Sequence, residues 1–231
     1  MEFVVERRGR AKARLSLEPR LVLNAGYAGR NQEAVRRHIE ELEQLGVPRP
    51  GRVPMVFAVS NHLLLNLSVL QVIDTQSSAE IEYVLLFHRG SVYVTVGSDH
   101  SDREVETRSI QKAKNSYPNV VAGTVWPLDE VTGHFDQLEL TCEATRGDAI
   151  VPYQHGKAAD LLPPSYWLDW VRRAGLFESD VVFYSGTIAA QDGLHHGDAY
   201  RLRLHDPVLG REIVHSYRCP VVSVPEVAEK A

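Results

Sequence analysis

Short apolar runs separated by polar turns follow one another along this chain of 231 residues. Most runs are four to eight residues long, as strands are, and are bounded by glycine, proline, asparagine or aspartate. They predict strands over residues 3–6, 21–26, 55–59, 78–87, 92–96, 120–123, 138–143, 180–187, 200–204 and 213–217.

Two stretches have the spacing of helices instead. The first begins after Asn31, a residue suited to cap a helix N-terminus, buries Val35 and Ile39 on one face, and ends at Gly46. The second begins at Pro163-Pro164 and ends at Gly175. Many strands, two helices and no regular strand–helix–strand alternation predict a β-rich α+β fold rather than a doubly wound sheet.

The length suits one large domain with a sizeable core. We predict a strand and linker over residues 1–20 and a single domain over 21–231, because no composition shift marks another boundary.

Composition and charge exclude several classes of protein. Hydrophobic residues make up 44% and charged residues 24%, and the net charge of −5 argues against nucleic acid as the main partner. No apolar run approaches the ~20 residues that cross a bilayer, and the N-terminus lacks a signal-peptide core. Cys142 and Cys219, the two cysteines, have no metal-type spacing. A cytoplasmic location is the simplest expectation.

Three acids lie where two predicted strands would bring them together. Glu80 and Glu82 are two residues apart, so on a strand they point to the same face, and Asp99 follows the next apolar run. If the two runs pair, three carboxylates meet, and a divalent cation that prefers oxygen ligands is the natural partner. The alternative is a solvated strand face, since this acid spacing is common on exposed strands.

Several separated segments resemble motifs of the fumarylacetoacetate hydrolase superfamily, from about Leu21 to Tyr217. The superfamily's E-x-E pair looks like Glu80-Ile81-Glu82, and its G-N-D segment resembles Gly97-Ser98-Asp99. The remaining similar segments are Gly26-Tyr27-Ala28-Gly29-Arg30-Asn31-Gln32, Lys112-Ala113-Lys114, Ser185-Gly186-Thr187 and His196-Gly197-Asp198.

The resemblance implies a mixed β-roll of the type of that superfamily's C-terminal domain, a homodimer, and a metal-dependent enzyme. It makes Glu80, Glu82 and Asp99 the metal ligands, with Mg²⁺ favoured over Mn²⁺ or Ca²⁺. Lys114 becomes a catalytic lysine that stabilises an enolate. The expected contacts to a small oxo-acid substrate are Thr187, Gly186, Tyr27 and Arg30. Arg103 is expected to anchor its loop by pairing with acids.

The sequence departs from the superfamily at the catalytic histidine, whose place is taken by Gln32. Glutamine orients water but does not take its proton at neutral pH, so His38 and His100 become candidates for a displaced base. Hydrolytic cleavage of a C–C bond in a 2-oxo or 1,3-diketo acid is the first hypothesis. A decarboxylase, hydratase or tautomerase on the same enolate is the second, and a catalytically inactive oxo-acid-binding protein is the third.

Overall fold

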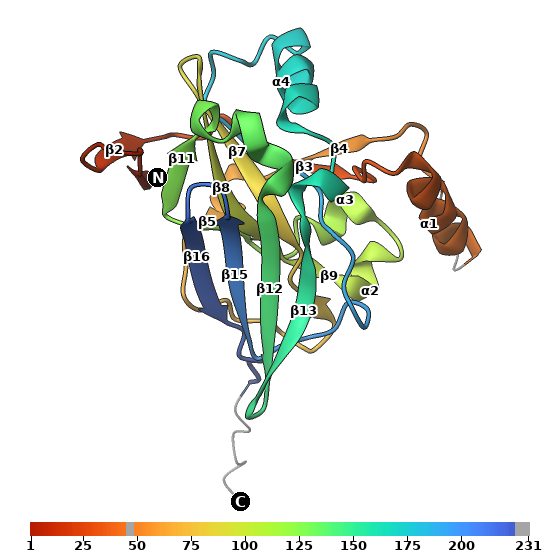
Figure 1. The fold of residues 1–231 in the computed structure, drawn as a ribbon. Helices are drawn as coiled ribbons and strands as arrows, with labels where there is room; N and C mark the ends of the chain where they lie inside the picture. Colours follow the sequence, from red (N-terminus) through yellow and green to blue (C-terminus); the bar gives the residue numbers. More distant parts are fainter. Residues whose placement is uncertain (45–48, 225–231) are drawn as a thin grey trace, which may run out of the picture.

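The computed structural model describes residues 1–44 and 49–224, in which two sheets and a short strand pair form a β-rich α+β fold (Figure 1). The large sheet has ten strands: β1 (Glu2–Val5), β2 (Ala13–Ser16), β3 (Leu21–Gly26), β4 (Met55–Val59), β5 (Leu64–Leu65), β7 (Ile81–His88), β8 (Ser91–Asp99), β10 (Asn119–Val121), β11 (Thr124–Pro127) and β14 (Val181–Tyr184). The second sheet has four: β12 (Glu139–Arg146), β13 (Ala149–Lys157), β15 (Ala199–Asp206) and β16 (Arg211–Arg218).

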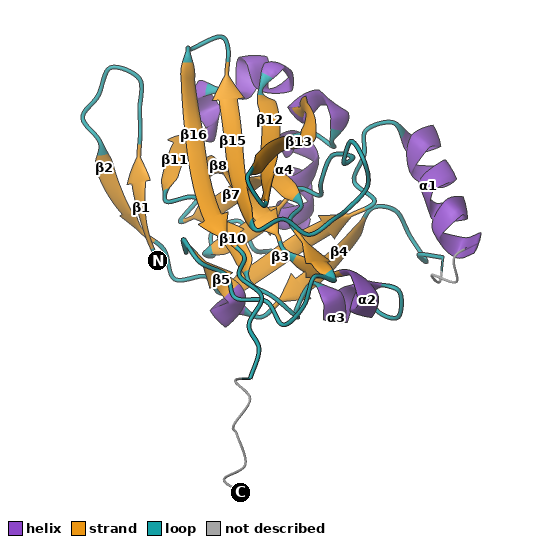
Figure 2. Ribbon diagram, turned by 90° about the horizontal axis from the view of Figure 1, so that it is seen from below, coloured by secondary structure: helices purple, strands orange, loops and turns teal. Residues whose placement is uncertain are grey.

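The remaining elements are a short strand pair, four helices and four 3₁₀ turns within the described residues. The short pair consists of β6 (Ser77–Ser78) and β9 (Ser101–Asp102). The helices are α1 (Gln32–Gln44), α2 (Arg103–Glu106), α3 (Ile110–Ala113) and α4 (Pro164–Arg173), with 3₁₀ turns η1 (Asn61–Leu63), η2 (Leu128–Glu130), η3 (Thr132–Gln137) and η4 (Ala158–Asp160). Helix α1 extends away from the sheets in both views (Figures 1 and 2). No helix within the described ranges is long and apolar enough to cross a membrane.

The strand order of the large sheet is β2-β1-β11-β8-β7-β14-β3-β4, with β10 and β5 beside the end of β8. Strands β7 and β8 pair antiparallel at its centre, with Ile81 opposite Ser98 and His88 opposite Ser91. The free side of β8 is divided between β11, which pairs near Tyr93, and β10, which pairs as far as Asp99. Residues 1–20 form the hairpin β1–β2, which joins this sheet through β1 and β11.

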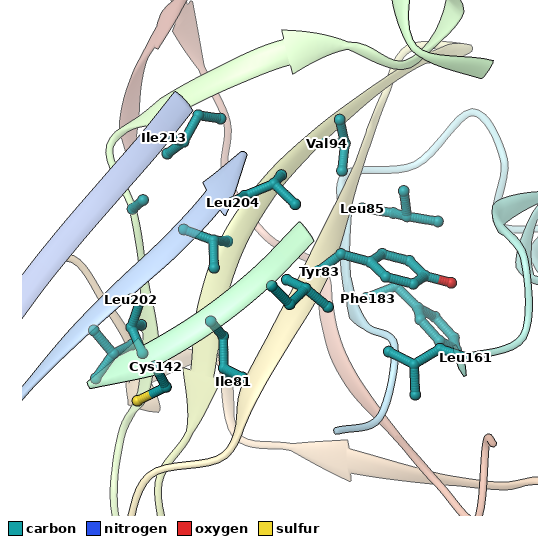
Figure 3. Packing of buried hydrophobic residues seen from close by; sticks show 14 of the residues in the cluster. Ile81, Tyr83, Leu85, Val94, Cys142, Leu161, Phe183, Leu202, Leu204 and Ile213 are labelled. Carbon is teal, nitrogen blue, oxygen red and sulfur yellow. The ribbon is translucent and has the colours of Figure 1, made fainter. Parts of the chain in front are cut away.

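The four-stranded sheet packs against β7 and β8 and closes the main core (Figure 2). From β7 this core receives Ile81, Tyr83, Leu85 and Phe87, which meet Cys142, Leu202 and Leu204 of the smaller sheet (Figure 3). On the opposite face of β7, Val84 and Leu86 contribute to a second core with Phe3, Val22, Val121 and Tyr184. Both faces of the central strands are therefore buried, which explains their nearly unbroken apolar sequence.

The two predicted helices are confirmed. Asn31 caps α1, since its side-chain oxygen accepts hydrogen bonds from the backbone N–H groups of Glu33 and Ala34, and Val35 and Ile39 are buried. Gly46, the predicted end of this helix, lies outside the described residues. The second helix, α4, has Pro164 in its first turn and Trp167 fully buried.

Candidate metal centre

Three buried carboxylates meet where β7 begins and β8 ends. Glu82 lies opposite Gly97 in the β7–β8 register, and the backbone N–H of Asp99 donates to the carbonyl of Glu80 across 3.1 Å. One carboxylate oxygen from each of Glu80, Glu82 and Asp99 lies within 4.8 Å of the others. These residues are 7%, 1% and 0% exposed, so the alternative of a solvated strand face is wrong.

Strand alternation places these acids on the face of the second core. Glu82 alternates with Val84 and Leu86 along β7, and Asp99 has the same parity on β8 as Tyr93. The buried amides of Asn24 and Asn119 line the same region and bond each other through both side chains. The second core is thus apolar at one end and polar at the end that holds the carboxylates.

The hydrogen bonds of Glu82 leave one oxygen free. Its Oε2 accepts from the backbone N–H of Gly186 at 2.6 Å, while Oε1 is buried without a partner among the described residues. Gly186 has a φ of +86°, a left-handed conformation that glycine adopts without strain and that holds its N–H toward Glu82. An unpaired buried carboxylate oxygen is costly, and a cation at this position would remove that cost.

Two cations stand beside the carboxylates. The ammonium of Lys114 bonds Oδ2 of Asp99 and lies 3.6 Å from Oε2 of Glu80. The guanidinium of Arg103 lies 3.3 Å from the other oxygen of Glu80 and 2.8 Å from Glu106. Four carboxylates and two cations therefore interact here. Fully ionised, they carry a net charge of minus two, which one divalent cation cancels.

The protonation of these groups reflects that excess of negative charge. Burial, followed by the charge of Asp99, raises the pKa of Glu82 well above its ordinary value, and burial also raises the pKa of Glu80. Burial lowers the pKa of Lys114, but the charges of Asp99, Glu80 and Glu82 outweigh it and the net pKa is raised. The ammonium is thus held as a fixed positive charge, whereas burial and the neighbouring carboxylates disfavour the charged form of Glu82.

The donor set fits a hard divalent cation. Mg²⁺, Mn²⁺ and Ca²⁺ prefer carboxylate oxygens, and three converge here with one oxygen of Glu82 unpaired. Glu80, Glu82 and Asp99 would hold the metal, as the sequence predicts.

Helix α3 positions Lys114, which follows its last residue, beside the carboxylates. Ser109 caps this helix through its side chain, and the backbone N–H of Lys114 closes the last turn on the carbonyl of Ile110. The side chain then runs inward and passes 5.9 Å from the ring centroid of Phe57. The predicted site lysine is therefore buried and in contact with the carboxylates.

Arg103 anchors the approach to Glu80, as expected. Asp102 caps α2, and the guanidinium of Arg103 bonds the side chain of Ser78 at 2.8 Å, the Ser78 carbonyl at 3.1 Å and Glu106 at 2.8 Å. Glu106 was not predicted from the sequence. Its signal is the i, i+3 spacing from Arg103 on one short helix.

Three of the predicted site residues lie in the loop before α1 or at the start of this helix. Tyr27 is half-buried with a φ of +56°, and burial, then Glu106, raises the pKa of its hydroxyl, which also senses Lys114. Arg30 points its guanidinium at Asp136, with two bonds of 2.7 Å, and at the carbonyl of Leu161. The exposed side chain of Gln32 donates to the carbonyl of Gly29 at 2.9 Å. Arg30 and Gln32 thus bond loop and surface groups.

The structure describes the side chain of one candidate histidine base, His100, and not that of the other, His38. His38 lies in α1, and its side chain falls outside the described part of the structure. His100 is fully buried, with its ring nitrogens 3.2 Å from the hydroxyls of Tyr217 and Ser77. Burial, and secondarily Arg103, lower its pKa to about 3. No described histidine joins the group of three carboxylates. The catalytic base stays a prediction.

The loop after β14 borders the centre through its backbone. Thr187 donates its hydroxyl to the carbonyl of Ile81 at 2.8 Å and accepts from the amide of Gln154 at 2.8 Å. Gln154 in turn accepts from the backbone N–H of Ile81. The threonine hydroxyl is therefore occupied within the protein, and a substrate contact at Thr187 and Gly186 stays a prediction.

Comparison with solved structures gives matches along most of the chain. A 2-keto-3-deoxyarabinonate dehydratase matches with a TM-score of 0.65 at 13% identity, covering 90% of this chain and 76% of that one. The 2-keto-3-deoxy-D-arabinonate dehydratase bound to magnesium and 2,5-dioxopentanoate has a TM-score of 0.61 at 12% identity, covering 88% and 74%. The 4-oxalocrotonate decarboxylase from Pseudomonas putida G7, bound to calcium and acetate, has a TM-score of 0.54 at 15% identity, covering 88% and 78%.

These identities show the fold alone, and it is the fold of the fumarylacetoacetate hydrolase superfamily. No curated protein sequence matches the chain. A family model described as a protein of unknown function (DUF2848) matches residues 25–217, which include the whole metal centre. The chain therefore belongs to the DUF2848 family and has a fumarylacetoacetate hydrolase fold.

Proposed function

We propose that this protein is a metal-dependent enzyme that acts on a small 2-oxo acid or 1,3-diketo acid. The observation that carries the proposal is the buried group of Glu80, Glu82 and Asp99, with one oxygen of Glu82 unpaired and a net negative charge. A divalent cation bound there, with Mg²⁺ favoured, would supply a Lewis acid for the neighbouring oxygens of an oxo acid.

Lys114 supplies the second positive charge of the site. Its ammonium is fixed between Asp99 and Glu80 and cannot leave without unpairing buried carboxylates. A preorganised cation stabilises negative charge that develops on a substrate oxygen without reorganising during the reaction. We assign Lys114 this electrostatic role.

Lyase chemistry suits this site better than hydrolysis does. Loss of CO₂ from an oxo acid needs positive charge where the enolate develops and no base, whereas loss of water and tautomerisation also need a base that takes a carbon-bound proton. Hydrolysis of a C–C bond needs a base that activates water. Gln32, which replaces the superfamily's histidine, is exposed and bonds Gly29. The structural neighbours named as a dehydratase and a decarboxylase support the same preference, although their identity to this chain is low.

Hydrolysis of a C–C bond is the second candidate, and it requires a base outside the carboxylate group. His38 would be that base, because helix α1, which begins at Gln32, follows directly on the loop with Tyr27. The homodimer that the resemblance implies also remains a prediction.

Turnover assays with the metal-loaded protein test the proposal. Oxaloacetate and acylpyruvates, each with Mg²⁺, Mn²⁺ or Ca²⁺, are the first substrates. We expect turnover of at least one, a fall of about 10²-fold or more in Glu82→Gln through loss of the metal, and little change in Glu104→Gln. Glu104 is a matched control because its carboxylate is 67% exposed and, among the described residues, pairs only with Arg108.

The pattern of substrates decides the reaction. Oxaloacetate decarboxylation without acylpyruvate cleavage supports a lyase, whereas acylpyruvate cleavage that rises in Gln32→His and falls in His38→Ala supports a hydrolase. Stabilisation by these acids without turnover under any condition would instead indicate an oxo-acid-binding protein and would contradict the enzyme assignment.

A further inference from the structure

A basic hollow lies at the N-terminal hairpin. The hairpin itself lies beside β11 (Figure 1). It has a volume of about 280 Å³ and is lined by the cations Arg7, Arg8, Arg10, Lys12 and Arg211. Glu6 and Leu209 complete the lining, and Glu6 pairs with Lys12. Two distant parts of the chain, residues 6–12 and 209–211, therefore bring five positive charges and one negative charge to a single depression.

The loop that carries most of these cations is held in place. The backbone N–H of Arg8 donates to both carboxylate oxygens of Glu130, at 3.1 and 3.3 Å, and the same carboxylate accepts from Nη1 of Arg211 at 2.8 Å. The backbone N–H of Glu6 bonds the carbonyl of Val125 in β11. The loop is thus tied to Glu130 and β11, so the hollow is a built feature of the fold.

Arg211 forms the rigid side of the hollow. Its guanidinium lies 4.3 Å from the ring centroid of Trp126, and its side chain is 17% exposed. Asp206 is 3.5 Å from Nε, yet neither Nε nor Nη2 has a hydrogen-bond partner among the described residues. Glu130 and Asp206 hold this guanidinium in place, and it adds a fixed positive charge to one wall of the hollow.

The other arginines have no ion-pair partner in the described part of the chain. Arg7, Arg8 and Arg10 form no ion pair there, although the whole protein carries a net charge of −5. Like charges gathered on one loop repel one another, and a bound anion would relieve that repulsion. The hollow is therefore a positive region in a protein that is negative as a whole.

We propose that this hollow binds a small oxyanion that carries two or more negative charges, namely a diphosphate, either free or as part of a nucleotide. Arginine forks match the geometry of phosphate oxygens. The volume suits a small molecule, and the net negative charge of the protein disfavours a nucleic acid strand.

The hollow is separate from the metal centre. Trp126, which supports Arg211, pairs with Val94 in β8, whereas Asp99 lies five residues further along the same strand. At about 3.3 Å per residue, roughly 16 Å of β8 separates Val94, the partner of Trp126, from Asp99. The proposal is therefore independent of the reaction assigned to the metal centre.

Calorimetric titration of the metal-free protein at low ionic strength tests the proposal, with pyrophosphate, ADP and inorganic phosphate as probes. We expect pyrophosphate to bind, and Arg7→Gln/Arg10→Gln to weaken it about tenfold or more. Arg146→Gln/Arg218→Gln is the matched control, since it removes two exposed arginines elsewhere. Affinity should also fall as NaCl is raised.

Two comparisons separate the possible outcomes. ADP binding as tightly as pyrophosphate identifies a nucleotide as a possible source of the diphosphate, and weaker ADP binding identifies the free anion. Glu82→Gln must bind pyrophosphate like the wild type. No binding at low salt, equal weakening in both arginine pairs, loss of binding in Glu82→Gln, or binding only to vesicles of anionic lipid would overturn the proposal.

Discussion

The two faces of strand β7 are equally buried and chemically different. On one face, Ile81, Tyr83, Leu85 and Phe87 form an unbroken apolar row in the main core. On the other, Val84 and Leu86 give way to Glu82 within a single strand. The apolar row contributes to stability through the area it removes from water. The buried carboxylate opposes folding unless a cation compensates it.

This difference separates residues that hold the fold from residues that serve the site. A buried ion group is weak evidence for stability, since apolar residues of similar size often stabilise a protein as well or better. Glu82 has an unpaired oxygen where an apolar side chain would have none. Its presence is explained by the metal that we propose it binds.

At the apolar end of the second core, Leu86→Ala should have the largest effect on stability. Leu86 is fully buried, so the substitution removes apolar contacts and leaves a cavity, at a cost of about 2–5 kcal/mol of unfolding free energy. Urea denaturation measures this loss. Ile73→Ala is the control, because Ile73 is 70% exposed and should change stability by less than about 0.5 kcal/mol. Similar losses of unfolding free energy in the two variants would contradict the expected difference between a buried and an exposed position.

Where the apolar and polar ends of the second core meet, Gly97→Ala should lower the free energy of unfolding by about 1–3 kcal/mol through overpacking. A Cβ at Gly97 would lie 2.5 Å from the carbonyl of Val120 and 2.8 Å from the Tyr184 ring. Gly133→Ala is the matched control, since a Cβ there meets nothing within 4 Å. Differential scanning calorimetry on both variants measures the effect, and an unchanged transition in Gly97→Ala would count against the close approach of β8 and β10.

At the polar end, Glu82→Gln should leave the metal-free protein as stable as the wild type or about 1 kcal/mol more stable. Burial raises the pKa of Glu82, so the folded chain binds a proton that the unfolded chain releases near its ordinary pKa of about 4.3. The contribution of Glu82 to metal-free stability therefore falls as pH rises from about 4.3 toward the raised pKa. Urea denaturation between pH 4 and 8 with a chelator should give a flatter pH profile in the variant. An unchanged profile would argue that Glu82 is ionised in the metal-free chain.

Much of the fold follows from the spacing of apolar residues, and the missed strands have physical explanations. Strand β13 contains Pro152 and Gly156, which disfavour a strand in the sequence. In the structure β13 is an edge strand, and Pro152 pairs at a bulge opposite Glu143, where a missing N–H is tolerated. Strands β2 and β11 are four residues long and carry too little pattern to be recognised alone.

The carboxylate group could be predicted from strand parity and order, because Glu80, Glu82 and Asp99 lie on adjacent antiparallel strands. The positions of Arg30 and Gln32 could not, because they depend on a loop that meets Asp136 and Leu161 from distant parts of the chain. The influence of Glu106 and Lys114 on the pKa of Tyr27 likewise depends on where two short helices place these charges relative to that loop. Such contacts are long-range and leave no periodic signal.

The stability gained on adding Mg²⁺ to the metal-free protein tests the central claim most directly. Thermal or urea unfolding should show a gain for the wild type and Glu104→Gln that reaches about 2.7 kcal/mol when Mg²⁺ is at a hundred times its dissociation constant. Glu82→Gln should gain almost nothing, since it loses a buried ligand while remaining folded. Equal stabilisation of all three proteins by Mg²⁺, Mn²⁺ or Ca²⁺, or stabilisation of none, would contradict a metal centre at Glu80, Glu82 and Asp99.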